Sequence, residues 1–416
     1  MGKQRVVITG MGAVTPLGTG LDLYWDGLLR GRSGVRRITH LDAEKYSSQI
    51  AGEVPDFNPE QYMDKKELRR TAKFTQFGLA AAEMAVKDAD LDLDALDRDR
   101  CGVILGCGVG GIDATQDTCK IFEEKGPGRI SPFFVPMMIS NMVSGQTAIR
   151  FGFKGVNYTV VTACASGTNG VGEAFHRIQR GDVDLILTGG TEASITGVGL
   201  GGFCSMKALS LRNDQPERAS RPFDRDRDGF VIGEGAGVLV LESLEHARRR
   251  GARIYAEVLG YGATCDAYHM TAPDPEGNGA ARAMEMAIRE AGLDPCDINY
   301  INAHGTSTDL NDKTETMAIK RVFGDYAYRV AISSTKSMTG HLLGAAGGIE
   351  AIAAAKSVQE DRVAPTINYE NQDPECDLDY VPNHSRELRV NYAISNTFGF
   401  GGHNAVILLG KPGDRG

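Results

Sequence analysis

The 416-residue sequence lacks the features that mark several broad classes of protein. No apolar run approaches the roughly 18 residues of a membrane-spanning helix, so we expect no membrane span. Basic residues are outnumbered, with 45 Lys and Arg against 54 Asp and Glu and a formal net charge of −9. Because proteins that bind nucleic acid neutralise phosphates with a basic surface, we expect no nucleic-acid partner.

Paired cysteines and a secretion signal are also missing. The eight cysteines are dispersed and include no CxxC pair, which is typical of free thiols in a reducing compartment. The chain begins MGKQRVVITGMG and enters a strand-like segment without the charged, apolar and small-residue sections of a signal peptide. We therefore expect an intracellular protein.

The sequence is rich in glycine, with 52 residues, and it contains an internal repeat. The segment VVITGMGA at 6–13 is matched by AEVLGYGA at 256–263. Further on, EMAVKDADLD at 83–92 is matched by EMAIREAGLD at 285–294. In both places a helix ends in an acidic turn and a strand follows. Strands that alternate with helices are typical of βαβ units and a mainly parallel sheet.

The repeat predicts an α/β protein of two similar halves, residues 1–250 and 251–416. Each half also contains a strand, a turn and a helix rich in small residues, at 157–178 and 330–358. Helices of Gly and Ala can pack backbone to backbone, so we expect these two to form a buried central layer. The segments 107–155 and 200–230 are expected to be long functional loops.

Two glycine-containing motifs imitate known binding loops. GCGVGG at 106–111 fits the G-x-G-x-x-G of dinucleotide-binding folds, but no acidic residue closes a following strand. DRDRDG at 224–229 opens like a calcium loop, but Gly235 stands where that loop needs a bidentate Glu. We interpret the second as an ion-paired turn, and a dinucleotide-dependent oxidoreductase is a weak alternative function.

Three residues stand out because each follows a predicted strand, which is where ligands bind in α/β proteins. Cys164 lies in VVTACASGTNG, directly before a helix whose N-terminus would favour a thiolate. His304 follows INYINA, and His341 precedes a helix of Ala and Gly. Small neighbours beside Cys164 leave space for a substrate. A buried inert thiol and two structural histidines are the alternatives.

The segment KKELRRTAK interrupts the acidic character of the chain. Lys65, Lys66, Arg69, Arg70 and Lys73 recur at spacings that gather on one side of a helix. Such a patch favours the docking of an acidic partner, and a solvated helix face is the alternative.

Five motifs together carry a family resemblance. They are TACASGTNG around Cys164, RPFDRDRDGFVIGEGAG at 221–237, NAHGTSTDLND at 302–312, STKSMTGHLLGAAGG at 334–348 and NTFGFGGHN at 396–404. Nearly the whole chain resembles the β-ketoacyl-acyl-carrier-protein synthases, most closely the elongating type called synthase II. The resemblance implies a thiolase-like fold, in which two βαβαβ-type halves pack as a layered α-β-α-β-α body. It also implies a decarboxylative Claisen condensation in fatty acid biosynthesis, in which malonyl carrier protein extends a cysteine-bound acyl chain by two carbons.

The resemblance also assigns roles to individual residues. The catalytic residues would be Cys164 as nucleophile, His304 and His341 as enolate stabilisers, Lys336 as their support, and Phe400 as gate and oxyanion-hole donor. Substrate binding would involve Val109, Phe134, Thr306, Thr308 and Phe398, with Phe134 reaching across a dimer interface. An acidic acyl carrier protein, loaded with acyl or malonyl groups, would dock on Lys65, Lys66, Arg69, Arg70 and Lys207.

Further expectations follow from the same resemblance. Catalysis would need no cofactor, the protein would be a homodimer, and it would work in the bacterial cytoplasm, or in the plastid stroma if a transit peptide has been removed. Some relatives hold a structural monovalent cation, and the matching positions are Asn302, Ala303, Glu350, Ser395 and Asn396. A purely structural, hydrogen-bonded Glu350 is the alternative.

Departures and rival functions bear on the substrate. Asp309 and Ala272 replace the usual Pro and Ser of the family, which leaves the fine substrate preference open. A thiolase would need a second cysteine near FGFGGHN, and a non-catalytic chain-length subunit would lack Cys164. An elongating subunit of a polyketide system would share every catalytic residue, so it remains an alternative.

Overall fold

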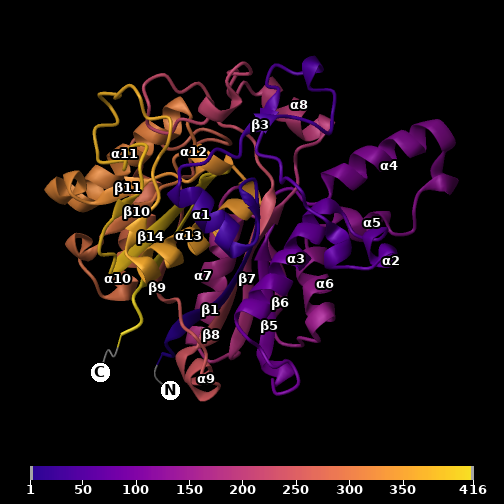
Figure 1. Cartoon of the computed structure of the whole chain (residues 1–416), viewed down its shortest axis with the longest axis horizontal. Coiled ribbons are helices and arrows are strands. Elements are labelled where there is room, and N and C mark those ends of the chain that lie inside the picture. Colours follow the sequence, from indigo (N-terminus) through magenta and orange to yellow (C-terminus); the bar gives the residue numbers. More distant parts are fainter. Residues whose placement is uncertain (1–2, 414–416) are drawn as a thin grey trace.

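Two matching sets of five strands form one mixed sheet in the computed structural model, which describes residues 3–413 (Figure 1). The first set is β1 (Val6–Thr15), β5 (Cys101–Gly106), β6 (Asn157–Val160), β7 (Leu185–Glu192) and β8 (Gly235–Ser243). The second set is β9 (Ala256–Cys265), β10 (Tyr300–Asn302), β11 (Ala331–Ser333), β14 (Tyr392–Gly399) and β15 (His403–Gly410).

The order of the strands shows the duplication directly. It runs β11-β10-β14-β15-β9-β1-β8-β7-β5-β6. Counted outward from the centre, each half places its first strand beside its fifth, followed by its fourth, second and third. The two similar halves are therefore confirmed. Four of the five strands in each half run parallel, as expected, but the fifth returns antiparallel between the first and the fourth, and the two halves meet through the antiparallel pair β1 and β9, so the sheet as a whole is mixed.

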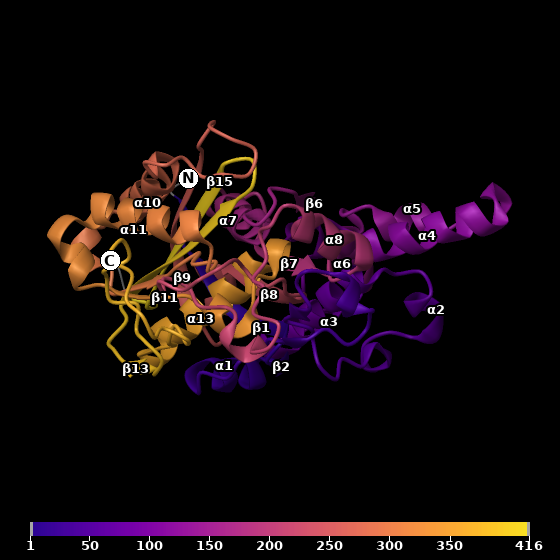
Figure 2. The same ribbon diagram turned by 90° about the horizontal axis from the view of Figure 1, so that it is seen from above.

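Helices form three layers around the two halves of the sheet (Figures 1 and 2). Helices α7 (Ser166–Gln179) and α13 (Ala346–Glu360) lie in the middle, and each contacts strands of both halves. Helix α3 (Lys73–Asp88) covers the outer side of the first half. Helices α10 (Asn278–Ala291) and α11 (Asp309–Phe323) cover that of the second. This is the expected α-β-α-β-α arrangement.

Glycine allows the central helices to lie against neighbouring backbone. A Cβ added to Gly167 in α7 would lie 2.9 Å from the carbonyl oxygen of Gly344. A Cβ on Gly348 in α13 would overlap the carbonyl oxygen of Gly237 in β8. Most of the remaining α13 residues are buried alanines and isoleucines. The predicted central layer of small-residue helices is confirmed.

The segment 107–155 is mostly helical, so its prediction as a long loop is wrong. It forms α4 (Ile112–Lys125), α5 (Phe134–Met138) and α6 (Met142–Phe151), and α4 and α5 project from the body (Figure 2). The glycines and proline at 126–128 lie in the turn after α4, where they interrupt the segment without preventing the helices. The segment 200–230 begins within α8 (Gly197–Ser205) and is otherwise largely loop, as expected.

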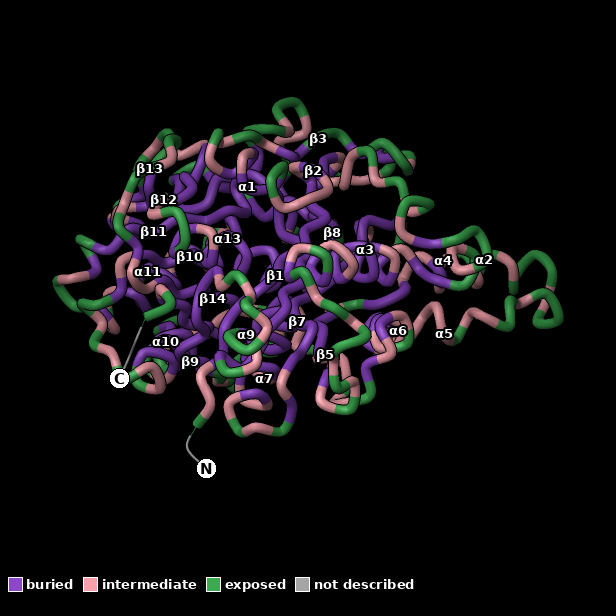
Figure 3. Tube along the Cα trace, turned by 60° about the horizontal axis from the view of Figure 1, so that its bottom comes forward, coloured by how far each residue is buried: buried purple, intermediate pink, exposed green. Residues whose placement is uncertain are grey.

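The remaining elements are short. They are α1 (Leu21–Leu29), α2 (Lys65–Leu68), α9 (Leu244–Arg249), α12 (Lys336–Thr339), β2 (Gly18–Thr19), β3 (Arg36–Arg37), β4 (Ile50–Ala51), β12 (Arg362–Val363) and β13 (Arg386–Glu387). The strands and central helices are largely buried, and exposed backbone gathers at the periphery (Figure 3). Within residues 3–413, no helix has the length and apolar character to cross a membrane.

Candidate active site

A pocket of about 520 Å³ opens where strands of both halves end. Cys164 follows β6, His304 follows β10 and His341 follows β11, and all three line this pocket. Parallel strands bring their C-terminal ends to one edge of a sheet, which explains why residues far apart in sequence meet here. The predicted residues Val109, Lys207, Thr306, Thr308, Phe398 and Phe400 line the pocket as well.

A tight turn presents Cys164 to the pocket. Ala163 has a φ of 50°, in the left-handed region, and α7 begins two residues after Cys164. The Ser166 hydroxyl accepts the N–H of Thr162 at 2.9 Å and donates to the carbonyl of Ala163 at 2.6 Å, which fixes the turn. A Cβ on Gly399 would lie 2.8 Å from the carbonyl oxygen of Thr162 and 3.2 Å from the Cys164 nitrogen, so glycine allows β14 to pack closely against this turn.

The Cys164 side chain is a thiol in the resting protein. Burial raises its pKa to about 12, and the charge of Lys336 and the backbone N–H of Phe400 lower it only in part. The predicted thiolate at the helix N-terminus is therefore not the resting state, because desolvation outweighs it. The N–H groups of Phe400 and of Cys164 itself both act on this sulfur. Phe400 is the residue that the sequence prediction named as an oxyanion-hole donor.

His304 and His341 form an edge-to-face pair of neutral imidazoles. Their ring centroids are 5.3 Å apart and their planes are inclined by 85°. Burial lowers both pKa values well below 6.5, and the charge of Lys336 lowers them further. His341 Nδ1 accepts the N–H of Leu343 at 3.3 Å, so the proton of this imidazole is on Nε2. A neutral imidazole with Nε2–H can donate a hydrogen bond to a substrate oxygen.

Lys336 lies beneath the histidines rather than in the pocket. Its Nζ forms a buried ion pair with Glu350 of α13. Burial raises the pKa of Glu350 to about 7, and Lys336 opposes that shift. The ammonium therefore supplies a fixed positive charge behind both imidazoles.

Four of the five residues expected at a cation site carry buried oxygens without a hydrogen-bond partner. The orphaned atoms are Asn302 Oδ1, Glu350 Oε2, Ser395 Oγ and Asn396 Oδ1. Ala303, the fifth, is fully buried beside Asn302. Buried oxygens without partners are costly, and hard cations prefer oxygen ligands, so this set fits a cation.

Four of the five predicted substrate-binding residues line the pocket, and the fifth does not. The hydroxyls of Thr306 and Thr308 are 2.9 Å apart on the pocket wall, and the Phe398 ring lies 5.6 Å from that of His304. Val109 lines the opposite side, after β5. Phe134 is not among the residues that line the pocket; it lies half-buried on α5.

The basic segment is exposed, but it is not one helix. Helix α2 ends at Leu68, and Lys73 begins α3, where its Nζ lies 2.7 Å from buried Glu234. Lys73 is therefore turned away from the patch. The five predicted docking residues Lys65, Lys66, Arg69, Arg70 and Lys207 are all exposed, and Lys207 lies at the rim of the pocket.

The DRDRDG segment is an ion-paired turn, as predicted. Arg221 lies 3.1 Å from Asp224, and Arg227 donates to Asp373 at 2.6 Å. Arg227 also lines the pocket and donates to the carbonyl of Thr308 at 3.2 Å.

Two carboxylates of α11 hold the His304 segment, and the sequence reasoning missed both. Glu315 accepts the N–H groups of His304 and Gly305, each at 2.8 Å. Asp312 accepts the N–H of Thr306 at 3.0 Å. Burial raises the pKa of Glu315 to about 7. The available signal was a pair of acids three residues apart, which places them on one face of a helix that directly follows His304.

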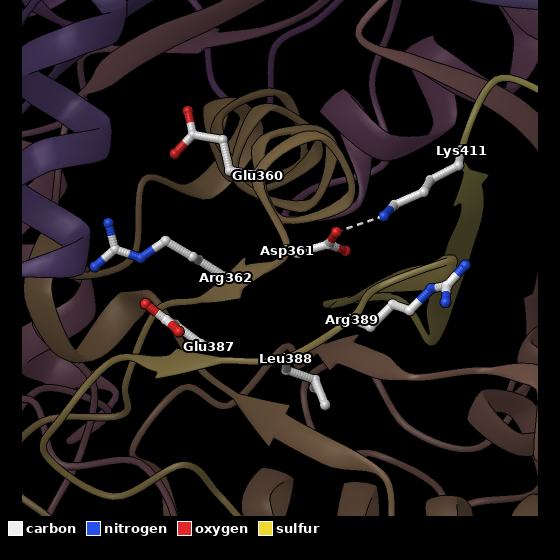
Figure 4. A pocket seen from close by; sticks show the side chains of 7 residues that line it. All are labelled: Glu360, Asp361, Arg362, Glu387, Leu388, Arg389 and Lys411. Atoms are coloured by element: carbon white, nitrogen blue, oxygen red, sulfur yellow. Dashed lines mark hydrogen bonds and ion pairs between the residues drawn. The ribbon is translucent and has the colours of Figure 1, made fainter.

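A second hollow of about 630 Å³ has no lining residue in common with the pocket around Cys164 (Figure 4). It is lined by three acidic side chains, three basic ones and Leu388, and Asp361 and Lys411 pair within it at 2.6 Å. Because its charges balance and it contains no nucleophile, it offers no comparable chemistry.

Comparison with known proteins gives concordant matches. The model of the β-ketoacyl synthase N-terminal domain matches residues 3–247, and that of the C-terminal domain matches residues 255–370. The 3-oxoacyl-[acyl-carrier-protein] synthase 2 of Synechocystis sp. is 54% identical over 98% of each chain. That of Staphylococcus aureus is 55% identical, covering 98% of this chain and 99% of its own.

Solved structures agree with these relatives. A β-ketoacyl synthase from Burkholderia phymatum is 36% identical with a TM-score of 0.92, covering 99% of this chain and 100% of its own. A type II polyketide ketosynthase, solved in complex with its acyl carrier protein, is 37% identical with the same TM-score and coverage.

Proposed function

The chain belongs to the β-ketoacyl synthase family, and we propose that Cys164, His304 and His341 carry out its reaction. The protein is an acyltransferase that acts as a 3-oxoacyl-acyl-carrier-protein synthase and extends fatty acyl chains. The observation that carries the residue assignment is the pocket itself, where a buried cysteine from one half meets two neutral imidazoles from the other.

Acylation of Cys164 is the proposed first step. The sulfur attacks the thioester carbonyl of an acyl carrier protein, and the new oxyanion accepts hydrogen bonds from the N–H groups of Cys164 and Phe400. When the intermediate collapses, the carrier thiol leaves with the proton that Cys164 gives up. The acyl chain then extends past Val109.

Condensation uses the two imidazoles. Loss of carbon dioxide from the malonyl thioester leaves an enolate whose oxygen accepts hydrogen bonds from His304 and His341. Its carbon attacks the acyl-Cys164 carbonyl, and the cysteine sulfur leaves. Neutral imidazoles suit this task because they donate hydrogen bonds without adding a mobile proton that would quench the carbanion.

Intact-protein mass spectrometry tests this assignment. Wild type should gain one acyl adduct from acyl carrier protein thioesters and lose it to malonyl carrier protein, with a product two carbons longer. Cys164→Ala should gain none. An adduct of equal size on Cys164→Ala would overturn the assignment. The same series, run with polyketide-type donors, separates fatty acyl from polyketide substrates.

An acidic acyl carrier protein is the proposed docking partner. Its surface would be the exposed set Lys65, Lys66, Arg69 and Arg70 together with Lys207 at the pocket rim. Opposite charges on two surfaces steer their encounter and set orientation. The solved relative in complex with its acyl carrier protein supports this proposal.

A homodimer is the proposed assembly. Strand β6 forms one end of the sheet, so within residues 3–413 one of its edges is unpaired, and Val161 directly after it is 57% exposed. Val135 on neighbouring α5 is similarly exposed. A second copy at this edge would cover these side chains, and its Phe134 would complete the acyl pocket.

A monovalent cation is proposed at the orphaned oxygens of Asn302, Glu350, Ser395 and Asn396. It would brace β10 and β14 beneath the histidines and take no part in the chemistry. A midpoint temperature of thermal unfolding that rises in potassium and not in tetramethylammonium would support this.

The proposed location is the bacterial cytoplasm, in keeping with eight free cysteines.

A further inference from the structure

Glu192 is a fully buried carboxylate that ends β7 beneath the floor of the pocket. Its Oε2 accepts the N–H of Gly108 at 2.9 Å and that of Val109 at 3.2 Å. The same oxygen accepts the N–H of Gly344 at 3.2 Å. Gly108 and Val109 follow β5 in the first half, whereas Gly344 belongs to the second half. One carboxylate thus joins backbone from both halves at the active site.

The contact with Gly344 reaches His341 through a single peptide. Leu343, the residue before Gly344, donates its N–H to His341 Nδ1 at 3.3 Å. Leu343 has a φ of 49°, an unfavourable conformation for a leucine, so this turn needs external restraint. Among the described residues, Glu192 is the acidic side chain that accepts a hydrogen bond from this turn. Holding the turn keeps Nδ1 occupied and therefore keeps the proton of His341 on Nε2.

The nucleophile turn lies against the same cluster. A Cβ on Gly108 would lie 2.8 Å from Glu192 Oε2, 3.3 Å from the carbonyl of Ala163 and 3.5 Å from the Gly344 nitrogen. The wall that contains Val109 and the turn after His341 therefore share one carboxylate, and the turn that presents Cys164 lies beside Gly108 in the same cluster. Cys107 completes the cluster, with its Sγ 3.8 Å from Glu192 Oε1.

We propose that Glu192 is a positioning residue for the condensation. It fixes the Nε2–H tautomer of His341, and it sets the distance between this Nε2–H group and the pocket wall that contains Val109. This inference rests on the proposed function and adds a residue to it. The role parallels that of Glu315, which accepts the N–H groups of His304 and Gly305 in the second half. The two donors for the enolate would then each be held by a buried carboxylate.

The test compares Glu192→Gln with Glu192→Asp. The Gln side chain keeps one acceptor oxygen for these donors, but it loses the second acceptor and places an NH₂ group at the Oε1 position, where Glu192 accepts the N–H of Val109 at 3.3 Å. We expect kcat for decarboxylation of malonyl carrier protein to fall about 10- to 100-fold, the scale of a misplaced catalytic group, with KM changed less than about twofold. Asp keeps both acceptor oxygens and should recover part of the loss. Glu242→Gln is the matched control, because Glu242 is an equally buried carboxylate on adjacent β8 and contacts Thr9, His246 and Arg250 outside the pocket.

A spectroscopic readout separates positioning from general stability. In wild type labelled with ¹⁵N-imidazole, His341, assigned by its loss in His341→Ala, should show a protonated Nε2 and an unprotonated Nδ1. Glu192→Gln should show a mixture of tautomers, whereas Glu242→Gln should keep the wild-type spectrum. A His341 proton on Nδ1 in wild type would overturn the inference even if no Glu192 variant folds. Wild-type kinetics and tautomer in Glu192→Gln would do the same. Wild type that fails to condense at all would instead refute the proposed function.

Discussion

The chemistry at the residue scale depends on which side chains burial makes neutral. Cys164, His304 and His341 all lose their charged form because the pocket floor excludes water. Lys336 keeps a charge there, since it pairs with Glu350. The site therefore combines one fixed cation with three neutral reacting groups.

The first prediction concerns the pH dependence of malonyl decarboxylation. Both imidazoles have a pKa well below 6.5, so they stay neutral, and the rate should remain flat as the pH falls from 8 to about 6. At lower pH, protonation of His341 on Nδ1 would remove the hydrogen bond that Nδ1 accepts from Leu343, and the rate should fall. In Lys336→Met the positive charge is lost, the imidazole pKa values rise, and the acid limb should move to higher pH. A pH–rate profile measures this. An acid limb of the wild-type profile centred at about pH 6.5 would contradict the prediction.

The second prediction concerns the length of the acyl chain. Val109 lines the pocket directly beside the turn held by Glu192. Val109→Phe adds a ring where the chain must pass, so long acyl donors should lose at least about tenfold in kcat/KM, while short donors keep theirs. Steady-state kinetics over a series of saturated acyl carrier proteins measures this. Unchanged activity on long chains would show that the chain takes another route.

At the scale of whole elements, glycine determines how closely the central helices approach neighbouring backbone. Gly348 of α13 lies against the carbonyl of Gly237, and Gly167 of α7 lies near that of Gly344. These contacts set the distance between the two helices and the sheet. Because Cys164 precedes α7 and His341 precedes α13, the packing of these helices also positions the nucleophile and the enolate donor.

The third prediction tests this close packing. Gly348→Ala places a methyl group on a backbone oxygen that cannot move away, so it should lower the free energy of unfolding by about 1–3 kcal/mol. Gly202→Ala is the control, because Gly202 lies inside α8 with no atom within 4 Å of an added Cβ. There the better helix propensity of Ala should stabilise the protein by up to about 1 kcal/mol. Urea unfolding of both variants provides the comparison. Equal changes in the free energy of unfolding of Gly348→Ala and Gly202→Ala would show that the close contact of Gly348 does not determine stability.

Sequence alone predicted the elements that repeat and failed where an element has no counterpart. The matched segments at 6–13 and 256–263 became the first strands of the two halves, and Cys164, His304 and His341 met in one pocket as strand ends require. Helices α4 and α6 were missed because the glycines, prolines and methionines around them resemble loop composition. The roles of Glu192 and Glu315 could not be read either, since their backbone partners are brought to them only by the tertiary fold.

At the scale of the whole molecule, the two ends of the sheet have different surroundings. Strand β11 at one end is preceded by a short turn, whereas α4 and α5 project from the side of the molecule on which β6 lies (Figure 2). This asymmetry is the basis of the proposed dimer.

The fourth prediction tests the assembly. Val161→Asp puts a charge at the open edge beside β6, so the protein should run as a monomer of 44.6 kDa in light scattering. Tyr328→Asp is the control, because Tyr328 is 54% exposed and lies just before β11 at the opposite end of the sheet. That variant should remain dimeric. A dimer that persists in Val161→Asp would place the interface elsewhere.

The equivalent positions of Cys164 and His341 mean that one place in a repeated unit serves two different purposes. Each lies between the third strand of its half and the central helix that follows, β6 and α7 in one case and β11 and α13 in the other. In the first half this place holds the sulfur that would carry the electrophilic acyl group, and in the second half it holds a hydrogen-bond donor for the enolate. Neither half contains both groups, so one half alone could not carry out the condensation.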